Sequence, residues 1–140
     1  NAQLLGYVAD IVPGLSSRAV FAEREYITAN EELVTAIACA NLEANHWIGS
    51  SKEGFVAYAM DNVRGANEEA VSKFYDVAMQ INMFPTTPAE LLDTSGYQGL
   101  ADLLYDGGEI DKQLDASEFV DSSYLERAAE MGCGTGAMSG

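Results

Sequence analysis

Apolar residues recur every three or four positions over residues 33–47, and this periodicity constrains the fold of the chain more than any other feature. The stripe consists of Leu33, Ile37, Ala40, Ala44 and Trp47. Such spacing places one apolar face along a helix, which we expect to be buried. Thr28 with Glu31 fits a capping box at the helix start, and Asn30 is a competing cap. Gly49 and Ser50 predict its end.

Further helices are predicted along the rest of the chain. One covers about 51–63, and a second covers 67–81 after a cap at Asn67. A third covers 88–106, begins at Pro88, ends before Gly107 and is interrupted near 95–96. A short helix over 122–130 is the last. From their apolar faces, the predicted core consists of Leu33, Ile37, Leu42, Trp47, Phe55, Phe74, Leu100, Leu103 and Leu104.

Residues 18–21 precede the long helix and combine β-branched and aromatic side chains, which predicts a short strand. The apolar run 4–12 comes earlier and ends at a Pro-Gly turn signal. The chain as a whole is therefore predicted to be mostly helical with one or two short strands.

Charge and composition narrow the class of protein. The 140 residues include 22 acids against 7 bases, a net charge of −15, and 48% of them are hydrophobic. That apolar content favours a globular chain over a disordered one. Because no basic stripe exists, we expect no binding to nucleic acid, and because no apolar run reaches about 20 residues, no membrane insertion in this segment.

The sequence offers little catalytic chemistry. It has a single histidine, His46, near the expected end of the long helix, where a structural role is favoured. The glycine-rich stretch 132–136 lacks the Lys-Ser/Thr ending of a phosphate loop. The acids between Asp102 and Asp115 lack the ligand spacing of an EF-hand and are expected to be a solvated face. We therefore expect no enzyme activity, no metal and no cofactor.

The two cysteines set no disulfide framework. Cys39 falls on the long helix and is expected to be a small buried apolar residue. Cys133 lies in the glycine-rich tail, and we expect a free thiol on a flexible segment.

Four segments taken in order carry a family resemblance: residues 16–48, 103–110, 114–115 and 120–126. Their order and spacing resemble the C-terminal part of ABC-transporter solute-binding proteins in the nitrate, sulfonate, taurine and thiamine-precursor group. The resemblance implies an α/β fold, specifically a fragment of a type II periplasmic-binding-protein fold. Residues 1–14 would finish the second lobe and the hinge return, 15–130 would be the C-terminal portion of the first lobe, and 131–140 a flexible tail.

The same resemblance implies a function in import. The protein would bind a small solute, with anions among the candidates, between two lobes and present it to an ABC permease, in the periplasm or on the outer face of the membrane. Any signal or lipid anchor would lie upstream, and the chain is expected to be a fragment. Ser16, Ser17 and Arg18 would lie beside the hinge and contact the solute through hydroxyls and a guanidinium. The alternative is that the serines form a turn while Arg18 pairs with a surface acid.

Two other function classes stay open. One is an enzyme similar to thiamine pyrimidine synthases, whose reacting residues would lie outside this chain. The other is a stand-alone helical interaction module.

Overall fold

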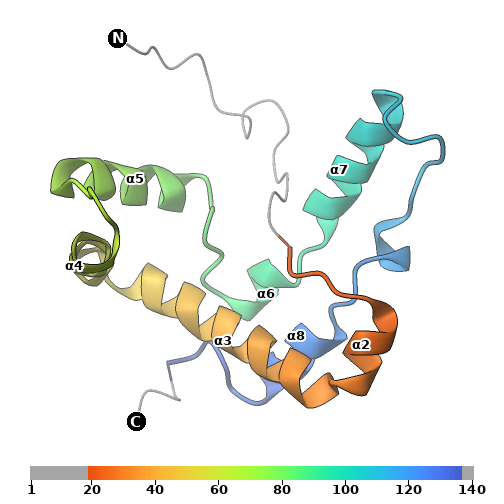
Figure 1. Cartoon of the computed structure of the whole chain (residues 1–140), viewed down its shortest axis with the longest axis horizontal. Coiled ribbons are helices and arrows are strands. Elements are labelled where there is room, and N and C mark those ends of the chain that lie inside the picture. Colours follow the sequence, from red (N-terminus) through yellow and green to blue (C-terminus); the bar gives the residue numbers. More distant parts are fainter. Residues whose placement is uncertain (1–18, 137–140) are drawn as a thin grey trace.

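The computed structural model describes residues 19–136, and this part of the chain is helical (Figure 1). The α-helices are α2 (Arg24–Ala29), α3 (Glu31–Ser50), α4 (Lys52–Asn62), α5 (Glu68–Gln80), α6 (Pro88–Leu91), α7 (Ser95–Asp106) and α8 (Ser123–Glu130). A 3-10 turn, η1 (Ala116–Glu118), lies between α7 and α8.

The predicted α/β fold is wrong for the described residues. Residues 19–136 contain no strand, so they do not form a lobe of a type II periplasmic-binding protein. The segment expected to be a strand enters the described part at Ala19 and has no regular structure, with Phe21 92% exposed. A strand needs a neighbour to complete its hydrogen bonds, and β propensity at three or four positions does not supply one.

Several helix starts follow the local signals of the sequence. Ser51, Asn67 and Thr87 each accept a hydrogen bond from a backbone N–H in the first turn of α4, α5 and α6. Thr87 and Glu90 form a complete capping box around the proline that opens α6. At the end of α7, Gly108 adopts a φ of 72°, the left-handed conformation in which glycine commonly closes a helix.

The start of the long helix α3 does not have the side-chain cap that the sequence predicts. Thr28 donates its hydroxyl to the carbonyl of Arg24, and Asn30 donates its side-chain amide to the carbonyl of Tyr26. Both side chains therefore turn back onto α2 and leave the start of α3 without a side-chain cap. The capping-box prediction is wrong here because a short helix ends where the long one begins.

Helix α3 is the central element of the described chain (Figure 1). It packs most extensively on α8, and α4 and α5 lie at its C-terminal end. Lys52 binds Asp76 at 2.6 Å between α4 and α5, and the Tyr75 hydroxyl donates to the carbonyl of Ile48 at 2.9 Å. The salt bridge joins α4 to α5, and the Tyr75 hydrogen bond attaches α5 to the end of α3.

The buried core is small and lies between α3, α6 and α8. It is centred on Leu42, Ala128 and Cys133, which are all almost fully buried. Partly buried apolar residues surround it: Ala38, Cys39, Leu91, Leu125 and Ala129.

Most of the predicted core is not buried. Leu42 confirms the prediction. Phe55, Leu100 and Leu104 are half-buried. The remaining members are exposed: Leu33, Ile37, Trp47, Phe74 and Leu103. Within 19–136, no helix combines the length and apolar character needed to span a membrane.

Candidate interaction surface

The predicted solute-binding residues Ser16, Ser17 and Arg18 lie outside the described residues. The described part offers a different candidate site, which is a helix surface and not a pocket. It lies on α3, the helix whose apolar periodicity is the strongest signal in the sequence.

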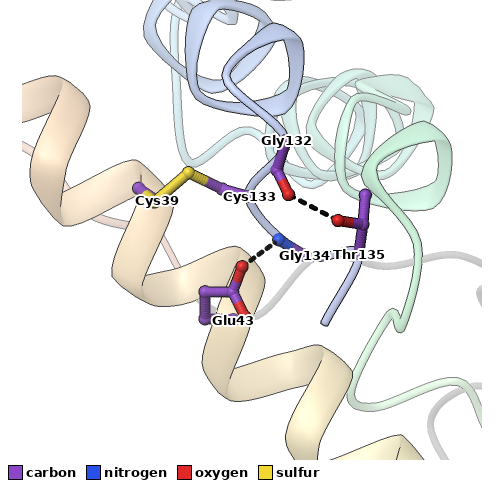
Figure 2. The surroundings of a disulfide bond; sticks show 6 residues. All are labelled: Cys39, Glu43, Gly132, Cys133, Gly134 and Thr135. Carbon is purple, nitrogen blue, oxygen red and sulfur yellow. Dashed lines mark hydrogen bonds between the residues drawn. A yellow bond between two sulfur atoms is a disulfide. The ribbon is translucent and has the colours of Figure 1, made fainter. Parts of the chain in front are cut away.

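The inner face of α3 is covered by the C-terminal segment. Cys39 forms a disulfide with Cys133, 94 residues later in the chain, and Cys133 is fully buried (Figure 2). Gly134 then donates its backbone N–H to the Glu43 carboxylate at 2.7 Å. The prediction of a free thiol at Cys133 is therefore wrong.

The segment after α8 is held in place by short contacts. Thr135 donates its hydroxyl to the carbonyl of Gly132 at 2.6 Å, which closes the turn shown in Figure 2. Gly136 lies so close to His46 that a Cβ at this glycine would come within 3.0 Å of the imidazole Nε2. The predicted flexible tail, 131–140, thus begins with residues that pack on α3, and residues 137–140 lie outside the described part.

The outer face of α3 carries the apolar stripe. Leu33, Ile37 and Trp47 are 48%, 44% and 43% exposed, and Ala40 and Ala44 between them are exposed as well. At about 100° per residue, these five side chains fall within about 80° of arc. We call these five residues the outer stripe.

The outer stripe lies opposite the inner face. Leu42, at the centre of the inner face, follows Leu33 by nine positions, which corresponds to about 180° around the helix. The side of α3 that packs on α8 is therefore the far side from the stripe. Sequence periodicity finds the stripe but assigns it to the core, which is wrong.

An aromatic pair extends the outer stripe at its C-terminal end. The rings of Trp47 and Tyr58 meet edge to face, with centroids 5.7 Å apart and an interplanar angle of 76°. Tyr58 belongs to α4 and is itself largely exposed. The apolar surface therefore continues from α3 onto the neighbouring helix.

Two shallow hollows elsewhere are polar and acidic. One, of about 340 Å³, is lined by residues that include Gln98, Asp115 and Glu118. The other, of about 310 Å³, is lined by residues that include Arg24 and Asp121. Neither has the apolar, enclosed character of an ordinary small-molecule site.

Two carboxyl groups in these hollows accept hydrogen bonds from residues of the turns to which they belong. Hydrogen bonds from the Ser117 side chain and backbone lower the pKa of Asp115. Those from the Ser123 side chain and backbone likewise lower the pKa of Asp121. Both groups are therefore ionised at neutral pH, unlike a carboxylic acid that is kept protonated for catalysis. Across residues 19–136, no group of His, Cys, Asp and Glu is placed to hold a metal ion.

No family model, curated protein sequence or solved structure matches the chain.

Proposed function

We propose that residues 19–136 form a disulfide-closed helical module that binds another protein through the outer stripe of α3. The exposed stripe is the observation that carries this proposal. Scattered apolar residues are normal on a protein surface, whereas a continuous apolar row on one helix is typical of a docking surface. The stripe has no charged member, so desolvating it on binding is favourable.

The inner face of α3 supports the same function. The disulfide, the Glu43–Gly134 hydrogen bond and the packing on α8 fix the helix from behind. A docking helix held in this way loses little conformational freedom when a partner binds. The outer stripe is thus presented on a rigid support.

The disulfide also supports a proposal about the compartment in which the protein works. Disulfides persist in oxidising compartments such as the periplasm or the cell exterior. We propose that the module works there, on the outer side of a membrane. Solute binding with Ser16, Ser17 and Arg18 stays a prediction, and the α/β lobe on which it was based is not formed by residues 19–136.

A photo-crosslinking side chain at Ala44 tests protein binding in the cells that make the protein. Ala44 is an exposed member of the stripe, and the matched control is Ala70, an exposed alanine on α5. We expect one discrete cross-linked product from Ala44 that Ala70 does not give. Equal products from both positions, or none from Ala44, would contradict the proposed function.

A further inference from the structure

The spacing of the outer stripe specifies the shape of its partner. Its five residues follow one another at intervals of four, three, four and three. This is the a/d spacing of a heptad repeat, in which side chains of a second helix insert between those of the first. An extended strand, with a side-chain period of two, does not match such a row.

The side chains of the stripe show what the partner helix must bring. Ala40 and Ala44 are small and lie between Ile37 and Trp47, so the middle of the row leaves room for large side chains from the partner. From Leu33 to Trp47 the row is about 21 Å long, which a helix of about 15 residues covers.

The charges around the stripe restrict the partner further. Helix α3 contains Glu31, Glu32 and Glu43 and no Lys or Arg. Arg127 from α8 lies 3.5 Å from Glu31. The Gly134 N–H that donates to Glu43 is neutral, so within residues 19–136 Glu32 and Glu43 both keep their negative charge without an ion pair. In the heptad spacing of the stripe, Glu43 occupies a g position, directly beside the apolar row. A second copy of the chain would bring acid against acid, with a charge of −15 on each side. Charge complementarity beside the outer stripe instead favours a partner with basic residues.

We propose that the outer stripe binds an amphipathic helix that carries Lys or Arg beside its apolar a and d positions. This proposal rests on the proposed function and adds the chemical class of the partner. Burial of the stripe supplies the affinity, and the basic residues select the partner and speed its approach to the acidic chain.

Designed peptides test this partner class, with Trp47 as the reporter. It is the sole tryptophan of the 140 residues and lies in the stripe, so its emission reports docking directly. Three peptides of about three heptads each would be compared. The first has Leu and Ile at a and d with Lys at e and g, the second has Glu at e and g, and the third has the Lys composition with the apolar residues scrambled.

We expect the Lys peptide to bind at least tenfold more tightly than the Glu peptide, and the scrambled peptide not to bind. The affinity of the Lys peptide for the protein should fall as the salt concentration is raised. Ile37→Glu and Ala44→Glu should each weaken the affinity for the Lys peptide at least tenfold, in protein whose helical circular dichroism is unchanged. Met131→Glu, at an exposed position outside the stripe, should leave it unchanged.

Equal binding of the Lys and Glu peptides would overturn the basic partner class. Absence of binding by the Lys peptide, while Ala44 still cross-links a protein, would also overturn it. In that case the proposed function would hold, but the partner would belong to another class. A concentration-dependent dimer that Ile37→Glu abolishes would assign the stripe to a second copy instead. A cross-link from Ala40 to residues 1–18 of the purified chain would assign it to the chain's own N-terminal segment.

Discussion

Gly134 shows how a single residue lets the C-terminal segment approach α3. Its φ is 78°, a conformation that side chains disfavour. A Cβ added here would also lie 3.0 Å from the Cβ of Leu42. The close approach places the Gly134 N–H within reach of Glu43 and lets the disulfide form beside it.

We therefore expect Gly134→Ala to lower the free energy of unfolding by about 1–3 kcal/mol, from the positive φ and the crowding together. Gly108→Ala is the matched control, because Gly108 has a φ of 72° but no atom within 4 Å of its added Cβ. Urea denaturation of both variants measures the difference. Equal losses would show that contact with Leu42 plays no part.

At the scale of elements, α3 is apolar on two opposite faces, and only the inner one holds buried side chains. The inner face buries Leu42 and Thr35. The outer stripe has the longer row of apolar residues and the more regular spacing. A helix with two apolar faces does not reveal from its own sequence which of them packs.

Paired substitutions on α3 separate the two faces. Leu42→Ala should cost about 2–5 kcal/mol, because Leu42 is 1% exposed and its loss leaves a cavity. Leu33→Ala, on the same helix but 48% exposed, should cost less than about 1 kcal/mol. Thermal or urea unfolding of the two variants provides the comparison. A larger loss for Leu33 would mean that the outer stripe is packed in the isolated protein.

At the scale of the molecule, one covalent bond joins the first long helix to the end of the described chain. The Cys39–Cys133 disulfide closes a loop of 94 residues. Closing a loop of this size restricts the unfolded chain strongly. The core it adjoins is small, so we expect a large share of the stability to depend on this bond.

Reduction should therefore destabilise the protein by about 2–5 kcal/mol. The measurement is the urea midpoint with and without a phosphine reductant, and Cys39→Ser with Cys133→Ser serves as the permanently reduced control. The double variant should match the reduced protein and be insensitive to the reductant. A midpoint that reduction leaves unchanged would mean that the bond adds nothing to stability.

What the sequence determined by itself is local. The cap at Asn67 and the proline that opens α6 lie where the sequence predicts them, and α7 ends at the predicted glycine, because helix starts and ends depend on neighbours within a few positions. The 4-3-4-3 row on α3 is also plain in the sequence, but the spacing alone predicts a buried face, and only its exposure in the structure leads us to propose it as a docking surface.

The tertiary structure decided which face of α3 is inside. The sequence places Cys39 and Cys133 94 residues apart, and only folding brings them together on the side of α3 away from the stripe. It also decided against a strand near Phe21, because a strand depends on a partner that residues 19–136 do not provide. Both outcomes rest on contacts between distant segments, which local spacing does not specify.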